Sequence, residues 1–190
     1  MNRNSVAIVI LAGGEARRFP GKLQRLVRGT PLVVTVYRNL RGRFPVYVST
    51  RGVMAADLRD LLHAPIIVDR WAEYGPLGGL ATAADALGYE RLFIAAGDAP
   101  AVTGAVLETL LAAWKSGDEA AVPEHSGRLE PLAALYDRMA LLRKAKKAMA
   151  LQNYALHALL DRMKVRRVPL PDEYFVNVNT EADLARIGED

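Results

Sequence analysis

The chain has 190 residues, of which 51% are hydrophobic and 24% are charged, so it has enough apolar sequence to build one compact domain over residues 1–190. The net charge is only +4 and the basic residues are scattered, which favours small-molecule partners over nucleic acid. Cysteine is absent, which excludes disulfides, thiolate metal sites and cysteine nucleophiles. No apolar run reaches the ~20 residues of a membrane span, so we expect no membrane partner and a cytoplasmic location.

Short apolar runs alternate with segments of helical period along the chain. Strands are predicted at residues 5–11, 45–50, 65–69, 91–96, 120–122, 129–135 and 165–168. Helices are predicted at 31–40, 54–62, 77–87, 103–114, 139–163 (with a break near Asn153) and 180–187. We expect Thr103 and Thr180 to be helix N-caps, the second with Asp183 at the third helical position, and Ser126-Gly127 to form a turn.

This alternation predicts an α/β fold, a three-layer sandwich with a mainly parallel, Rossmann-like sheet and helices on both faces. Ligands of such sheets bind beyond the carboxyl ends of the strands. The chemistry should therefore follow Leu11, Thr50, Ile67 and Ala96.

The segment after the first strand, residues 11–22, reads LAGGEARRFPGK. Gly13 and Gly14 would let backbone N–H groups approach a phosphate, and Arg18 and Lys22 add positive charge nearby. Leu23 after Lys22 excludes a Walker loop, and the dinucleotide pattern G-x-G-x-x-G is also absent. A tight turn followed by solvated basic residues is the alternative, but the combination favours triphosphate binding.

Two carboxylates stand at predicted strand ends. Asp98 follows the strand at 91–96 and is placed to hold Mg²⁺, which takes one or two carboxylates plus phosphates and water. Because Pro100 follows closely, Asp98 could instead cap a turn. Asp69 could accept hydrogen bonds from a base edge or simply end its strand. Three glycines within residues 75–79, starting at Gly75, suggest either backbone approach to a base or ribose, or tight helix packing.

Asn177 and Asn179 alternate along an extended segment and so lie on the same side of it. They could clamp a phosphate or a polar ring, or belong to turn and cap chemistry before the last helix. The three histidines, at 63, 125 and 157, show no metal-ligand spacing, and we expect them at the surface or at helix ends. The basic run at 143–147 is expected to be a solvated helix face, with contact to an anionic acceptor or a carrier protein as the alternative.

In this order, these segments resemble those of the molybdenum cofactor guanylyltransferases, over nearly the whole chain. The family pattern L-A-G-G-x-x-R-R is found at residues 11–18, G-P-L-x-G-L at 75–80 and N-x-N-T at 177–180. Related cytidylyltransferases carry Ala at the position of Gly13, so this residue resembles the guanylyl branch. Residues 130–136 resemble the strand that precedes the acceptor-side helix of the family.

The resemblance implies a GT-A-like nucleotidyltransferase fold and transfer of GMP from Mg·GTP to the phosphate of molybdopterin, with Mg²⁺ as cofactor and pyrophosphate as the leaving group. Its implied catalytic residues are Arg18, Lys22 and Asp98, of which Asp98 holds the metal. Its implied acceptor residues are Asn177 and Asn179. The implied nucleotide-binding residues are Leu11, Ala12, Gly13, Gly14, Lys22, Asp69, Gly75 and Asp98. A molybdenum-insertion or acceptor carrier protein is a further implied partner.

The chain departs from the family in the spacing from Arg18 to Lys22, which is one residue shorter, and at residues 49–51, where Ser-Thr-Arg stands in place of a frequent Asn. Other functions therefore stay open. One is transfer to cobinamide phosphate or a sugar phosphate, or cytidylyl transfer, by an enzyme of the same superfamily. Another is nucleotide binding without catalysis.

Overall fold

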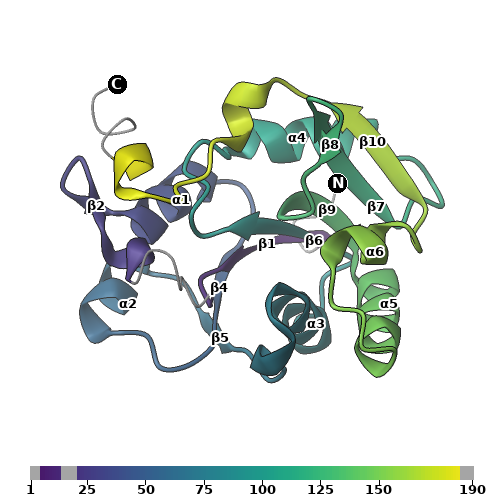
Figure 1. The fold of residues 1–190 in the computed structure, drawn as a ribbon, viewed down its shortest axis with the longest axis horizontal. Coiled ribbons are helices and arrows are strands. Elements are labelled where there is room, and N and C mark those ends of the chain that lie inside the picture. Colours follow the sequence, from purple (N-terminus) through teal and green to yellow (C-terminus); the bar gives the residue numbers. More distant parts are fainter. Residues whose placement is uncertain (1–4, 14–20, 185–190) are drawn as a thin grey trace.

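The computed structural model describes residues 5–13 and 21–184. A twisted sheet lies at its centre, with the strand order β10-β7-β9-β6-β1-β4-β5 and with β8 paired to β7 (Figure 1). The strands are β1 (Val6–Leu11), β4 (Val46–Thr50), β5 (Ile66–Val68), β6 (Arg91–Ala96), β7 (Ala120–His125), β8 (Arg128–Leu129), β9 (Ala133–Asp137) and β10 (Val165–Pro169).

The sheet is mainly parallel, as predicted. β1 pairs in parallel with β4 and β6, β4 pairs in parallel with β5, and β7 pairs in parallel with β10. β9 runs antiparallel between β6 and β7. The carboxyl ends of β1, β4, β5 and β6 consequently meet along one edge, which is where the sequence predicts the chemistry.

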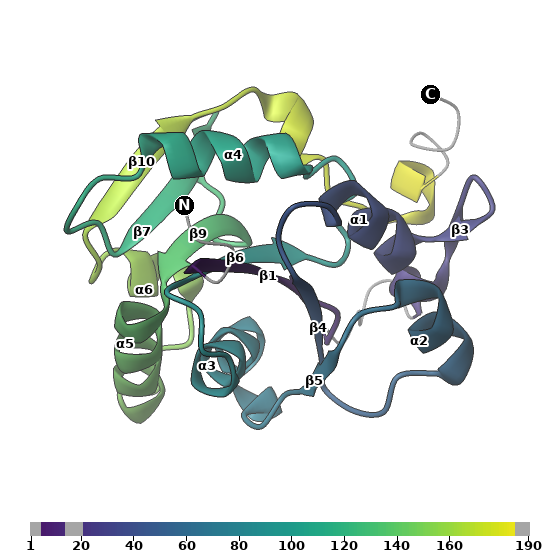
Figure 2. The same cartoon turned by 180° about the vertical axis from the view of Figure 1, so that it is seen from behind.

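Helices cover both faces of the sheet, which confirms the three layers (Figures 1 and 2). They are α1 (Leu32–Leu40), α2 (Ala56–Leu62), α3 (Pro76–Ala86), α4 (Gly104–Ala113), α5 (Arg138–Ala150) and α6 (Leu156–Leu160). One hydrophobic core joins the sheet to α1, α2 and α4, and another joins its opposite face to α3, α5 and α6. Among the described residues, none of the helices has the length and apolar character needed to cross a bilayer.

The apolar run of β1 is explained by these two cores. Ile8 and Ile10 pack toward the α1 side, while Ala7 and Val9 pack toward the α3 side. Because successive side chains of a strand point to opposite faces, a strand covered on both sides must be apolar at every position.

Several elements differ from their predicted form. The strand expected at 129–135 is divided into β8 and β9, and Pro131, which has no N–H to donate, lies in the gap. The hairpin of β2 (Leu26–Val27) and β3 (Thr30–Pro31) was not predicted. Thr103 stands at the N-cap of α4, but its side chain makes no capping hydrogen bond. The break in the long helix is confirmed, since α5 ends at Ala150.

The two predicted turn and cap motifs near the C-terminal half are present. Ser126 and Gly127 join β7 to β8 with φ of 45° and 71°, the positive values of a tight hairpin turn. Thr180 Oγ1 accepts a hydrogen bond from the Asp183 N–H at 3.1 Å, and Asp183 Oδ2 accepts one from the Thr180 N–H at 3.0 Å. The helix that they cap is described over residues 181–184, and the rest of its predicted length lies outside the described residues.

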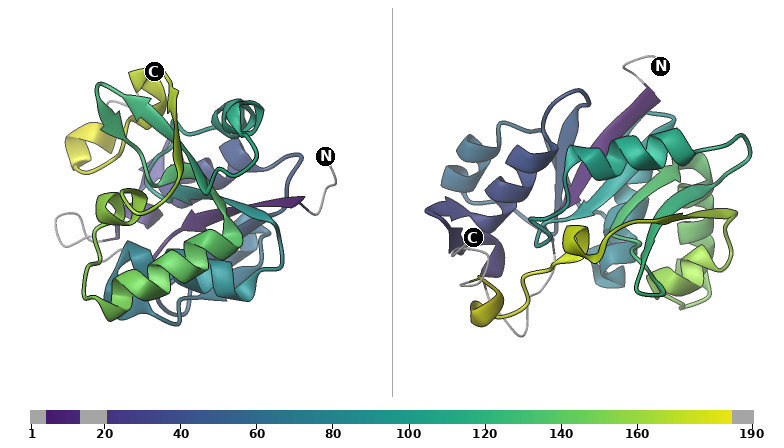
Figure 3. Two further views of the ribbon diagram at one scale, coloured as in Figure 1. Left: turned by 90° about the vertical axis from the view of Figure 1, so that its right-hand side faces the viewer. Right: turned by 90° about the horizontal axis from the view of Figure 1, so that it is seen from above.

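The C-terminal segment returns from β10 across the molecule toward α1 and the β2–β3 hairpin (Figure 3). It contains a short 3₁₀ helix, η4 (Asp172–Phe175). Val178 is then buried against Val27 and Leu32, and its N–H donates to the Asp98 carbonyl oxygen at 2.9 Å. Val178 is therefore held at the carboxyl edge of β6.

Candidate active site

A cavity of about 170 Å³ opens beyond the carboxyl ends of β1, β4, β5 and β6. Of the residues implied by the sequence, those lining it are Leu11, Gly13, Lys22, Asp69, Gly75 and Asp98. Ala12 lies beside it, with its N–H donating to the Ser49 carbonyl oxygen at 2.8 Å. Gly14 and Arg18 lie outside the described residues. The structure thus brings together residues that are up to 87 positions apart, from Leu11 to Asp98.

Lys22 and Asp98, which both line this cavity, form an ion pair. The Lys22 side chain is 15% exposed and that of Asp98 is 21% exposed, so the pair is largely shielded from solvent. Lys22 Nζ also donates to the Val178 carbonyl oxygen at 3.2 Å. The one-residue shortening of the loop therefore does not prevent Lys22 from reaching the strand end that carries Asp98.

The donor chemistry at Asp98 fits a hard divalent cation. In the part of the chain that the structure describes, no three His, Asp or Glu side chains gather into a ready-made metal site. A single carboxylate beside an open cavity suits Mg²⁺, which usually takes only one or two protein carboxylates and completes its shell with phosphate oxygens and water. In the structure the Asp98 carboxylate is paired with the ammonium group of Lys22.

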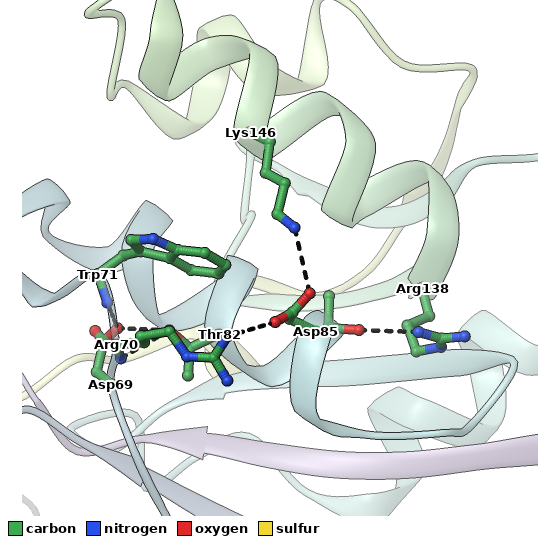
Figure 4. Close-up of polar contacts among 8 residues, drawn as sticks. Asp69, Arg70, Trp71, Thr82, Asp85, Arg138 and Lys146 are labelled. Carbon is green, nitrogen blue, oxygen red and sulfur yellow. Dashed lines mark hydrogen bonds and ion pairs between the residues drawn. The ribbon is translucent and has the colours of Figure 1, made fainter.

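Asp69 is held in one orientation by its neighbours (Figure 4). Its Oδ1 accepts a hydrogen bond from the Trp71 N–H at 2.9 Å and another from the Thr82 hydroxyl at 2.7 Å. Thr82 is 3% exposed, and its oxygen accepts in turn from the Arg70 N–H at 3.0 Å. The two hydrogen bonds to Asp69 therefore both engage Oδ1. Its other oxygen, Oδ2, lies beside Gly79 on the cavity wall, where a Cβ added to Gly79 would be 3.5 Å from it.

A second layer of contacts braces the loop that carries Asp69. The Trp71 ring has the Arg70 guanidinium 5.5 Å and the Lys146 ammonium 5.3 Å from its centroid. Arg70 and Lys146 both pair with Asp85 on α3, at 2.8 Å and 3.3 Å (Figure 4). Arg138, at the start of α5, donates to the Ala84 carbonyl oxygen at 3.0 Å. The loop is therefore anchored to α3 and α5 rather than left to solvent.

The glycines of the site have distinct roles. Gly75 adopts φ 64° and ψ −144°, a conformation that side chains strongly disfavour, and it lines the cavity immediately before α3. At Gly13 a Cβ would stand 2.9 Å from Arg51 Cγ and 3.0 Å from Arg51 N, so the missing side chain makes room for the loop after β4. Close packing against protein, rather than against a phosphate alone, thus accounts for Gly13.

A larger cavity, of about 720 Å³, lies on the other side of Asp98. It shares Ala96, Asp98 and Leu132 with the first cavity. Its other walls come from the β7–β8 hairpin, α6, β10 and the C-terminal segment, including Arg128, Glu130, His157, Arg167, Phe175 and Asn177. Asp98 is therefore accessible from both sides.

Asn177 and Asn179 are separated by this arrangement. Asn177 lines the larger cavity, whereas Asn179 does not, and the Asn179 N–H donates to Asp183 Oδ2 at 3.0 Å in the helix cap.

The two cavities are lined by different parts of the chain. Apart from Leu132, the described residues that line the smaller cavity lie at or before Asp98, and those that line the larger cavity lie at or after Ala96.

Some residues of the site were missed by sequence reasoning. Thr82 was overlooked inside a predicted helix, although a lone hydroxyl in the apolar run at 77–84 could have indicated a buried polar role. Arg51 and Leu132 also line the smaller cavity. Part of the basic run at 143–147 is paired with acidic neighbours, since Arg143 lies 2.9 Å from Glu119, which agrees with a solvated helix face.

An α/β sheet with cavities meeting at one carboxylate suits a protein that brings a nucleotide and a second substrate together, which is the task of a nucleotidyltransferase. The sequence profile of the MobA-like NTP transferase domain matches residues 8–184. Since this is most of its length, the chain belongs to the MobA-like NTP transferase family.

Known proteins of this family align along nearly their whole length. A probable molybdenum cofactor guanylyltransferase of Mycobacterium marinum is 33% identical, over 95% of this chain and 92% of its own. The molybdenum cofactor guanylyltransferase of Desulfosudis oleivorans is 28% identical, over 96% and 94%. Among solved structures, molybdopterin-guanine dinucleotide biosynthesis protein A of Archaeoglobus fulgidus has a TM-score of 0.81 at 28% identity, covering 96% of this chain and 97% of that one. A CMP:2-keto-3-deoxy-manno-octonic acid synthetase shares the fold alone, with a TM-score of 0.75 at 15% identity.

Proposed function

We propose that this nucleotidyltransferase moves GMP from GTP to the phosphate of molybdopterin. An oxygen of the acceptor phosphate bonds to the α-phosphorus of GTP, the bond from that phosphorus to the bridging oxygen breaks, and pyrophosphate leaves. The observation that carries the proposal is the position of Asp98, which borders both cavities. The names of the aligned relatives support the choice of guanine and of molybdopterin.

The smaller cavity is the proposed nucleotide site. Phosphoryl-type transfer needs positioning and charge neutralisation more than a covalent nucleophile. Lys22 and Arg18 would neutralise phosphate charge, and the backbone N–H groups of Gly13 and Gly14 would donate hydrogen bonds to the phosphates. Gly14 and Arg18 lie outside the described residues. Asp98 would hold Mg²⁺, which when bound supplies charge neutralisation to the phosphates.

Base selection is assigned to Asp69. An ionised carboxylate only accepts hydrogen bonds, and guanine offers donors at its N1–H and its exocyclic amino group. Because the hydrogen bonds from Trp71 and Thr82 both engage Oδ1, Oδ2 beside Gly79 would accept from these donors. Gly75, Leu11 and Ala12 would form the backbone wall around the base and ribose.

The larger cavity is the proposed acceptor site. Arg128, His157 and Arg167 give it basic groups for an anionic phosphate, and Asn177 offers an amide to the pterin ring. Asn179 would contribute by anchoring the same segment through the helix cap.

The compartment expected from the cysteine-free sequence is the cytoplasm. A carrier protein that delivers molybdopterin would have to approach the larger cavity.

Thermal unfolding with GTP, CTP, ATP or UTP, each with Mg²⁺, tests the nucleotide half. A ligand at 100 times its dissociation constant stabilises the folded state by about 2.7 kcal/mol, which gives a clear shift in melting temperature. We expect a shift selective for GTP that is weakened by Asp98→Ala. Asp60→Ala, at an exposed position on α2, is the matched control and should leave the shift unchanged.

Pyrophosphate release on addition of molybdopterin tests the transfer. Preference for CTP would assign the chain to a sister transferase, and transfer to cobinamide phosphate or a sugar phosphate but not to molybdopterin would change the acceptor. Nucleotide binding that is independent of Asp98, without pyrophosphate release, would indicate a non-catalytic binding protein.

A further inference from the structure

His125 connects the two walls of the larger cavity. Its Nε2 lies 2.8 Å from Glu130 Oε1, next to the β7–β8 hairpin, and its Nδ1 lies 3.0 Å from Asp172 Oδ1 on η4. The imidazole also stacks on Phe175, with ring centroids 4.5 Å apart and planes inclined by 23°. Ser126 adds a hydrogen bond from its hydroxyl to Asp172 Oδ2 at 2.7 Å. We name these five residues the histidine clasp.

The clasp requires a charged imidazole. Carboxylates only accept hydrogen bonds, and a neutral imidazole has a single N–H, so both contacts can form only when the two ring nitrogens are protonated. Burial alone lowers the pKa of His125, but the hydrogen bonds to Glu130 and Asp172, and then their charges, outweigh it and raise the pKa above 6.5. Arg128 stands opposite His125 in the β7–β8 register and is exposed. Glu124, which precedes His125 on β7, is paired at 3.3 Å with Arg167 of the neighbouring strand β10.

The clasp holds the segment that leads to the reaction centre. Phe175 and Asn177 both line the larger cavity, and Val178, the next residue, bonds to the backbone of Asp98 and to Lys22. The facing wall is the hairpin from Gly127 to Glu130. The β7–β10 pairing and a hydrogen bond from the Leu170 N–H to the Glu124 carbonyl oxygen, at 3.1 Å, join the two walls at one end. The contact between His125 and Asp172, 47 positions apart in the chain, extends this connection toward Phe175 and the cavity.

We propose that His125 is a positioning residue for the acceptor, whose charged form closes the clasp and thereby sets the width of the acceptor cavity. This rests on the proposed function only in naming molybdopterin as the occupant. Acceptor use should weaken as the pH rises and the histidine loses its proton, because one of the two carboxylate contacts is then lost. The smaller cavity does not include the clasp, so GTP binding should not follow this titration.

Steady-state pyrophosphate release, with molybdopterin varied at saturating Mg·GTP from pH 6 to 8.5, measures the effect. Because the contacts are partly exposed, we expect the acceptor KM to rise about twofold to fivefold across this range. His125→Gln has one donor nitrogen in place of the two ring nitrogens that contact Asp172 and Glu130, so it should show the higher KM at every pH. Asp172→Asn, at an exposed position, should do the same without removing the stack on Phe175. Glu108→Gln, which alters the exposed ion pair between Glu108 on α4 and Arg43, is the matched control and should behave as wild type.

A second readout follows from linkage. If the charged histidine favours acceptor binding, acceptor binding must raise the pKa of His125 by the corresponding amount, which an NMR titration of its Cε1–H signal measures. In the free protein, hydrogen exchange at the Val178 amide should be faster in His125→Gln and Asp172→Asn than in wild type.

The outcomes separate this proposal from the proposed function. No GMP transfer to molybdopterin by wild type would refute the function, while the exchange of the Val178 amide would still test the clasp. An acceptor KM that is independent of pH and equal in wild type and Asp172→Asn would overturn the role of His125. So would an unchanged Val178 exchange rate in both variants.

Discussion

Removing one hydroxyl should loosen the recognition of guanine. In Thr82→Val the branched shape of the side chain is kept, but Asp69 loses a charge-assisted hydrogen bond of 2.7 Å and the Arg70 N–H loses its acceptor. Hydrogen bonds to charged groups contribute about 1.5–3 kcal/mol. Because the Trp71 N–H still donates to the same Asp69 oxygen at 2.9 Å, we expect about half of this hydrogen-bond free energy to be lost from the binding of GTP. A loss of about 0.8–1.5 kcal/mol corresponds to binding of GTP that is about 4-fold to 13-fold weaker.

Calorimetric titration with Mg·GTP and Mg·ITP tests this reasoning. Inosine lacks the exocyclic amino group of guanine, so the preference for GTP over ITP should shrink together with the affinity. Thr82→Ser retains the hydroxyl and should bind as wild type does. Thr35→Val removes a hydroxyl that bonds the Pro31 carbonyl oxygen on α1, away from the cavity, and should change nothing. Equal affinity of Thr82→Val and wild type for GTP, or an equal loss for all nucleotides, would refute the assignment of Asp69 to the base.

Three further predictions concern the ion pair and the acid range. Asp98→Ala should reduce turnover at least a hundredfold while circular dichroism and melting stay near wild type, because one carboxylate at a strand end adds little to the core; full activity would disprove the metal assignment. Lys22→Met should raise the GTP concentration needed for half-maximal turnover about tenfold, and an unchanged value would exclude a phosphate contact. Burial alone raises the pKa of Asp118, but its hydrogen bonds with Arg166 and the Lys115 N–H lower the pKa below 3.8. The ionised carboxylate therefore stabilises the folded state fully above pH 3.8, and this contribution to the free energy of unfolding is lost as the pH falls through the folded-state pKa. Urea unfolding at pH 6 and pH 3 should show it, and Asp118→Asn should reduce the difference.

The sequence was sufficient to predict the elements whose form depends on hydrophobic periodicity. The helices and the parallel strands that surround β1 lie where predicted, because burial on two faces imposes a continuous apolar run. Two-residue strands such as β2 carry no such period and were missed. The division of the strand at 129–135 was missed as well, although Pro131 gave a local signal.

The site was predicted where neighbouring strands position it and missed where distant segments meet. Lys22 and Asp98 could be placed together because each follows a strand at the same edge of the sheet. His125 was expected to be a surface or helix-end histidine, but it is 14% exposed and held by carboxylates on both sides. Its contact with Asp172 arises because β10 pairs in parallel with β7, and this pairing has no local signature in the sequence.

The division of the two cavity linings at Asp98 has a consequence for how such proteins can diverge. The residues that line the proposed nucleotide cavity and those that line the proposed acceptor cavity occupy consecutive stretches of the chain, with Leu132 as the exception among the described residues. A single genetic crossover near codon 98 would therefore replace most residues of one cavity lining together and leave those of the other lining unchanged. On this view new acceptors arise by changes in the later stretch, while the earlier one keeps an ancestral choice of nucleotide.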